Sequence, residues 1–209
     1  MQFKHLIIPA LVAVAFPAMS QTVNLSGFTY TPAITGNTYS STTPALNGSY
    51  LMGQFSGLLD GASFLTYCLE VPQAPLFNSN VSYTAGMSWD TTTAMSRAYT
   101  WVTNTLQPYD APSSGLAQAV LWEVLYETSG TYDLAAGNFK VASAWPLTPV
   151  DWSYIADASK LGAFTVLKLE NATYQDLLLA QPIPEVETYA LMLAGLAGVG
   201  FVARRRRPR

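Results

Sequence analysis

Both ends of this 209-residue chain are apolar segments that carry basic residues, and they fix how much sequence is left to fold. The first segment covers residues 1–20 and the second covers residues 182–209. Residues 21–181 stand between them, which is a length typical of one domain. We therefore expect one folded extracytoplasmic body between two targeting segments.

The first segment has the three parts of a secretory signal peptide. Lys4 supplies a positive start, residues 6–16 form an apolar run, and residues 18–20 read Ala-Met-Ser, a small-x-small cleavage site. The apolar run is too short to span a bilayer comfortably. We predict export through the Sec machinery and cleavage after Ser20.

The second segment has the parts of a short membrane anchor. Pro182 and Pro184 interrupt the chain, and residues 188–203 are apolar. A helix of that length rises about 24 Å, and arginines that snorkel can make up the rest of the hydrocarbon thickness. The arginines that follow are Arg204, Arg205, Arg206 and Arg207. The positive-inside bias predicts a transmembrane helix with these arginines in the cytoplasm and the body outside.

This end of the chain resembles the PEP-CTERM sorting signal. The resemblance consists of Pro184-Glu185, the apolar run with its Tyr-Ala-Leu-Met-Leu-Ala-Gly-Leu stretch at residues 189–196, and the arginine cluster; Val186 stands where the family prefers a second proline. The resemblance implies a Gram-negative host and an exosortase-type membrane protease as partner. It also implies an inner-membrane anchor with a periplasmic body before processing, and later a place at the cell surface or in an exopolysaccharide or biofilm matrix.

The composition of the body excludes several classes of function. Between Gln21 and Gln181 there are eleven acidic residues against only four basic ones, a net charge of −7, which argues against binding to nucleic acid. The only histidine, His5, lies in the leader, so the mature chain has no imidazole for a Ser-His-Asp mechanism or a zinc site. The only cysteine, Cys68, cannot form an internal disulfide. Calcium and phosphate loops are also missing from the sequence, and we expect no metal and no cofactor.

The body reads as mostly β. Residues 22–71 are rich in Thr, Ser, Gly, Asn and Tyr, with short apolar stretches at 49–55 and 62–69, and further strands are expected at 138–143 and 161–169. Two segments have helical spacing instead: 91–106, with Asp90 as a cap, and 113–128, with Ser113 or Ser114 as a cap. We predict a single β-sandwich or barrel-like domain with two inserted helices.

One pair of short motifs carries possible chemistry. Cys68 follows Tyr67 and precedes Leu69-Glu70, and Gln118 stands four residues before Trp122. These motifs resemble the Cys-Gln thioester domains of bacterial surface adhesins, which implies an internal thioester between Cys68 and Gln118 that nucleophiles on a target surface would open. The family usually has threonine where Ala117 stands. The plain alternative is that Cys68 is a small buried apolar residue and that Gln118 bonds the start of its helix.

Three functions follow from these observations, in this order. The first is a non-enzymatic structural or adhesive protein of the surface or matrix, in which aromatic residues such as Tyr83 and Tyr109 either pack in the core or stack on extracellular polysaccharide. The second is a covalent adhesin that uses the thioester. The third is a polysaccharide hydrolase with Glu123 and Glu127 as acid and base, which is disfavoured because these two carboxylates are expected on a solvated helix face.

Overall fold

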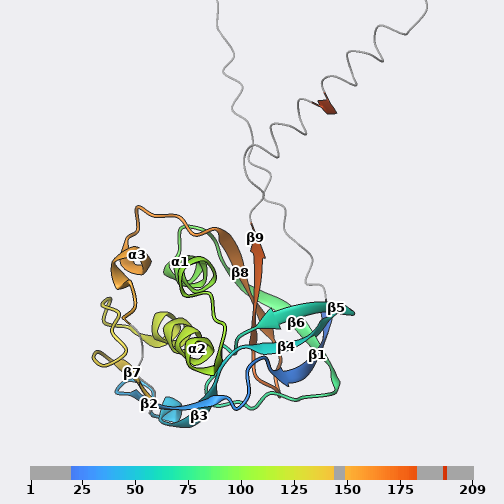
Figure 1. Cartoon of the computed structure of the whole chain (residues 1–209), viewed down its shortest axis with the longest axis horizontal. Coiled ribbons are helices and arrows are strands. Elements are labelled where there is room, and N and C mark those ends of the chain that lie inside the picture. The colour runs from blue at the N-terminus through green and yellow to red at the C-terminus, as the bar shows by residue number, and fades with distance from the viewer. Residues whose placement is uncertain (1–19, 144–148, 183–194, 197–209) are drawn as a thin grey trace, which may run out of the picture.

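The computed structural model describes residues 20–143, 149–182 and 195–196, and it divides into a barrel-like half and a helical half (Figure 1). The barrel-like half is one antiparallel sheet with the strand order β5-β4-β1-β6-β8-β9. Its strands are β1 (Ser20–Phe28), β4 (Phe55–Leu59), β5 (Ala62–Thr66), β6 (Asn80–Trp89), β8 (Phe164–Glu170) and β9 (Leu177–Pro182).

The sheet curls until its two edge strands nearly meet. The segment just after β5 completes the approach, because Leu178 donates its N–H to Tyr67 O at 3.0 Å and Leu69 donates to Asp176 O at 2.8 Å. The Thr66 hydroxyl adds a bond of 2.6 Å to Leu178 O. Residues 67–69, which we call the closing segment, therefore pair with the start of β9 and satisfy edge groups that would otherwise be open.

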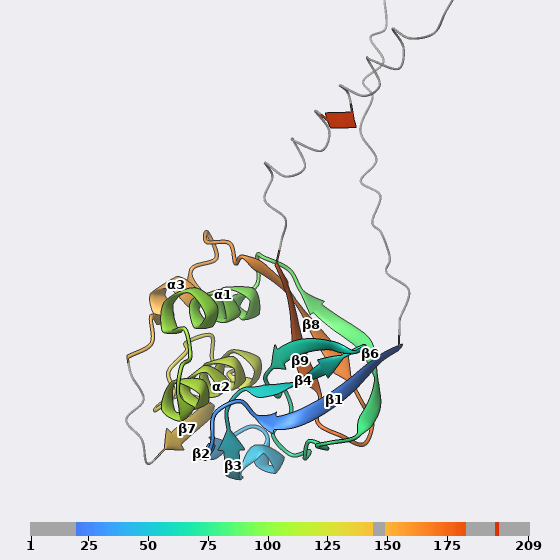
Figure 2. The ribbon, with the colours of Figure 1, turned by 45° about the vertical axis from the view of Figure 1, so that its right-hand side comes forward.

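The helical half packs on a second, smaller sheet (Figure 2). This antiparallel sheet has the order β3-β2-β7 and consists of β2 (Ile34–Ser40), β3 (Gly48–Met52) and β7 (Phe139–Ser143), with the 3-10 turn η1 (Pro44–Leu46) between the first two. The helices are α1 (Ala94–Trp101), the π-helical turn η2 (Val102–Leu106), α2 (Ala111–Tyr126) and α3 (Trp152–Ala156). Helix α2 contacts all three strands of the small sheet as well as α1.

Helix α2 lies in the core of the molecule. Residues 114–123 are buried without interruption, so the helix has no solvent face over most of its length. A helix that is apolar around its circumference is expected in such a place. Gly115 allows a close crossing with β2, because a Cβ there would stand 2.2 Å from the Ile34 side chain, which would have to move.

The mostly β character of the body is confirmed, and the strands expected at 138–143 and 161–169 correspond to β7 and β8. Both expected helices exist, but their caps were wrong. Thr93, not Asp90, caps α1 by accepting from Ser96 N, while Asp90 bonds Thr92 in the preceding turn. Asp110 caps α2 in a capping box whose reciprocal partner is Ser113.

Helix α3 was not expected, and it lies in the connection between the strands expected at 138–143 and 161–169. Its five residues begin after Asp151, which accepts a hydrogen bond from Tyr154 N. Arg97 of α1 holds this helix in place, because the Arg97 Nε donates to Ile155 O at 2.7 Å. The tertiary contact with α1, rather than helix propensity, accounts for this short helix.

Three predictions fall outside the described residues. These are the leader before Ser20, the sorting motif at Pro184-Glu185 with Arg204, Arg205, Arg206 and Arg207, and the transmembrane helix at 188–203 apart from residues 195 and 196. Within the part of the chain that the structure describes, no helix is long and apolar enough to cross a membrane.

Candidate thioester site

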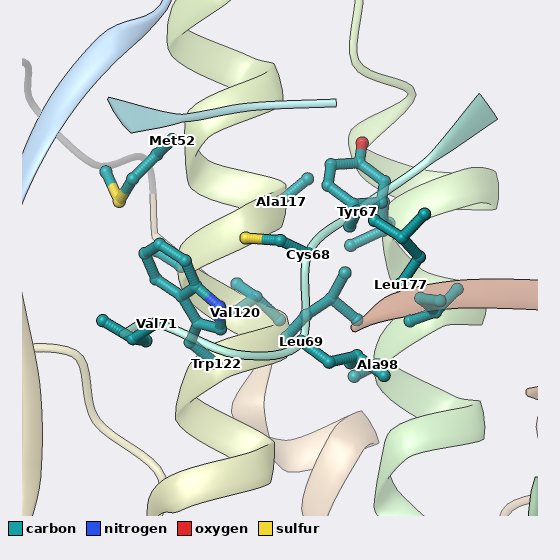
Figure 3. Packing of buried hydrophobic residues seen from close by; sticks show 14 of the residues in the cluster. Met52, Tyr67, Cys68, Leu69, Val71, Ala98, Ala117, Val120, Trp122 and Leu177 are labelled. Atoms are coloured by element: carbon teal, nitrogen blue, oxygen red, sulfur yellow. The ribbon is translucent and has the colours of Figure 1, made fainter. Parts of the chain in front are cut away.

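Cys68 is the middle residue of the closing segment. Its neighbours on both sides pair with β9, and Cys68 itself forms a bridge with Leu177. This pairing fixes the backbone in an extended conformation, in which successive side chains point to opposite sides. Figure 3 shows the Cys68 sulfur pointing into the helical half, toward the indole of Trp122 on α2.

Gln118 reaches the same place from the second turn of α2. The capping box at Asp110 fixes where the helix begins, and the Ser114 hydroxyl accepts the Gln54 N–H at 2.7 Å, which ties the first turn to the chain between β3 and β4. Gln118 is fully buried, so its amide must find partners inside the protein.

Among the described residues, the Gln118 amide forms its hydrogen bonds with Cys68. Gln118 Oε1 accepts from Cys68 N at 3.1 Å and from the Cys68 thiol at 3.3 Å, and Gln118 Nε2 donates to Cys68 O at 2.8 Å. The side-chain amide thus pairs with Cys68 as a neighbouring strand would. Of the plain alternative, the burial of Cys68 in the apolar core is confirmed. Its other part, in which Gln118 bonds the start of its own helix, is wrong.

This arrangement places the sulfur beside the carbon that a thioester would use. A C=O bond is about 1.2 Å long, so Sγ lies no more than about 4.5 Å from Gln118 Cδ. Attack on that carbon would put negative charge on Oε1, and the Cys68 N–H already donates to this oxygen. A fixed backbone donor at the developing oxyanion is the usual means of stabilising acyl transfer.

The environment of the sulfur is apolar. Burial strongly raises the pKa of the Cys68 thiol, while its own backbone N–H and the nearby Trp122 indole N–H, which has no hydrogen-bond partner among the described residues, favour the thiolate and offset part of this shift. The thiol is therefore protonated at neutral pH. Cys68 is only 2% exposed and Gln118 is 0% exposed. A thioester that nucleophiles on a target surface open is expected near the surface, and this site is buried instead.

The sequence motifs identified Cys68, Gln118 and Trp122, but they missed Tyr126. The Tyr126 hydroxyl donates to Leu69 O at 2.8 Å and so holds the closing segment against α2 one residue beyond Cys68. Gln118, Trp122 and Tyr126 are spaced four residues apart on one helix, which puts them on one face. That spacing is the signal that could have found Tyr126.

The expectation that Glu123 and Glu127 lie on a solvated face was wrong. Glu123 is completely buried, and its Oε1 accepts from Asp133 N at 2.8 Å. Glu127 is 9% exposed and accepts from the backbone N–H groups of Ser129, Asn138 and Phe139. The loop after α2 folds back over the helix and uses the two carboxylates as anchors, which explains their burial.

Several other side chains named in the sequence analysis lie outside the candidate thioester site. Tyr83 is buried in the core, with its hydroxyl bonded to Gln175 O, whereas Tyr109 is 76% exposed. Glu70, the acidic residue of the cysteine motif, lies 4.0 Å from Lys168, which also pairs with Asp176 at 2.6 Å. In the described ranges, no three His, Cys, Asp or Glu side chains are grouped to hold a metal ion.

Comparison with known proteins gave no match: no family model, no curated protein and no solved structure is significantly similar to this chain.

Proposed function

We propose that this protein is an exported, non-enzymatic surface or matrix protein whose body attaches covalently to a target through a thioester between Cys68 and Gln118. The observation that carries the proposal is the contact of the Cys68 thiol with Gln118 Oε1 at 3.3 Å, made by two residues 50 positions apart. The resemblance of the two motifs to thioester domains supports it. The C-terminal resemblance supports delivery by an exosortase-type system.

The bond would form by acyl transfer from nitrogen to sulfur. Cys68 Sγ attacks Gln118 Cδ, the C–N bond breaks, and the amide nitrogen leaves as ammonia with the thiol proton. No oxidant and no cofactor is needed. Because Gln118 is buried, the closing segment has to move away from α2 before a nucleophile on the target can reach the same carbon. Attack there returns the free thiol and leaves the target joined to Gln118.

The test is the mass of the full chain, purified and compared with a Cys68→Ala variant made in the same way. We expect wild type to fall short of its sequence mass by one ammonia, and the deficit to be absent in Cys68→Ala and in Gln118→Glu. Methylamine should open the bond, add its own mass and release a thiol that can be titrated. Wild-type protein of full mass with one free thiol would reject the thioester and leave a non-covalent surface protein.

A further inference from the structure

We propose that the open pocket beside Trp122 is a binding site for an uncharged sugar ring. The pocket has a volume of about 330 Å³ and lies between the β3 region, the loop after the closing segment and α2. That volume is at the lower end of the range of small-molecule sites and suits a ligand of one or two rings.

Aromatic rings supply much of the wall. Five of the lining residues are aromatic: Phe28, Tyr50, Phe55, Phe77 and Trp122. The rings are held in place by one another, because Tyr50 meets Trp122 edge-on at 6.5 Å and Phe55 meets Phe77 edge-on at 5.6 Å. Trp122 and Phe55 are almost fully buried and fix the wall, while the partly buried Phe28, Tyr50 and Phe77 supply the apolar surface that a ring ligand would meet. Such a wall does not have to be ordered on binding.

Two glutamines add hydrogen-bond acceptors that no other described residue uses. Gln175 is 5% exposed, and its Nε2 is occupied by Glu70 O, which leaves Oε1 without a partner among the described residues. Gln73 Oε1 also has no partner within the described ranges. Buried acceptors are normally satisfied, so two unpaired oxygens in the lining of one pocket indicate that a ligand with donor groups belongs there.

The absence of basic residues from the part of the lining that the structure describes excludes acidic ligands. None of the described lining residues is Asp, Glu, Lys or Arg, although the body as a whole is acidic. An acidic ligand would require a basic residue. An ammonium group can bind over aromatic rings without a carboxylate, so glucosamine is the comparator that separates it from a neutral ring. A hydrocarbon would leave the glutamine oxygens unpaired. A neutral ring with an apolar face and hydroxyl donors satisfies both parts of the lining.

The pocket also touches the candidate thioester site through one residue. Trp122 lines the pocket and lies next to Cys68 (Figure 3). A bound sugar would therefore contact a residue that lies next to the sulfur. On the proposed function, this makes the pocket the place where a glycan target is recognised before the bond is opened, but binding itself does not require the thioester.

The experiment uses the full chain carrying Cys68→Ala, in a detergent without a sugar headgroup, so that binding is measured in the absence of any thioester. The probes are the methyl glycosides of glucose, galactose, mannose and N-acetylglucosamine and their disaccharides, with glucosamine and glucuronate as charged comparators. Calorimetry and saturation-transfer NMR report binding. We expect at least one neutral glycoside to bind and both charged sugars to bind more weakly.

Variants locate the site. Ala74→Trp should fill the pocket and Gln73→Leu should remove an acceptor, each weakening binding about tenfold or more. The matched controls Ala62→Trp and Gln181→Leu change exposed residues outside the pocket lining and should bind as the parent does. Failure of every neutral glycoside to bind, tighter binding of a charged sugar, or equal effects of pocket and control variants would each overturn the proposal. None of these results bears on the mass test for the thioester.

Discussion

Gln118 acts on the backbone of Cys68 as well as on its sulfur. Its amide satisfies both the N–H and the C=O of Cys68, in the segment that closes the barrel-like sheet. This backbone role can be separated from thioester chemistry, because it persists when the sulfur is removed.

We therefore predict a large effect of Gln118→Met in a Cys68→Ala background. Methionine has nearly the volume of glutamine but no amide, so the Cys68-position N–H and C=O lose their partner in a buried place. The free energy of unfolding should fall by about 2–4 kcal/mol relative to Cys68→Ala alone. Denaturant unfolding measures it, with Gln181→Met as the exposed control. A change no larger than the control's would show that water or another group takes over these bonds.

Glu123 makes stability depend on pH in an unusual direction. Burial, with smaller contributions from the charges of Glu127 and Asp133, raises the pKa of Glu123 from 4.5 to about 8, although the bond from Asp133 N opposes the shift. In the folded state, the Glu123 carboxyl therefore stays protonated to a higher pH than it does in the unfolded chain. Its contribution to stability is fully present below pH 4.5 and is lost as the pH rises to 8.

The prediction is a decline in the free energy of unfolding between these two pH values, by as much as about 4 kcal/mol. Glu123→Gln keeps an acceptor for Asp133 N and cannot ionise, so its stability should change much less over the same range. Urea titrations at several pH values compare the two proteins. Parallel pH profiles would mean that Glu123 is ionised in the folded state at neutral pH.

At the level of elements, α2 depends on its first turn. Asp110 Oδ1 accepts from Ser113 N at 2.9 Å, and this capping box sets the register that carries Gln118 to Cys68. Asp110→Ala should lower the free energy of unfolding by about 1 kcal/mol. Asp157→Ala is the matched control, because Asp157 forms a similar bond to Ser159 N in a turn that starts no helix. Equal losses in the two variants would show that the box contributes nothing specific to α2.

Sequence patterns predict some of these elements and their contacts, but not others. Helix α2 was predictable because its apolar residues recur at helical spacing behind Pro112, but its cap lies before that proline, where the pattern had not begun. Burial of Glu123 was not predictable, since it depends on how the chain after Gly130 folds back. The pairing of Cys68 with Gln118 came from motif resemblance, because no local periodicity relates positions on a strand edge and a helix.

At the scale of the whole molecule, the arginine cluster is expected to act on delivery and not on the fold. Changing Arg204, Arg205, Arg206 and Arg207 to neutral residues removes the charge step that would stop the C-terminal helix. We predict unchanged export but impaired membrane retention and processing. Cell fractionation and the size of the mature chain measure this in an exosortase-containing host, with Lys140→Gln and Lys160→Gln as controls in the body. Processing of the variant at the wild-type rate would show that the four arginines are not part of the sorting signal.

The contact between Cys68 and Gln118 has a further consequence for the unfolded chain. A covalent bond between positions 50 residues apart restricts the denatured ensemble as a disulfide would, and a loop of that length corresponds to about 4 kcal/mol of chain entropy. In a body with a single cysteine, this would be the one cross-link available to it. Opening the bond on a target would release that restraint. The protein would therefore be easier to unfold once it is permanently attached.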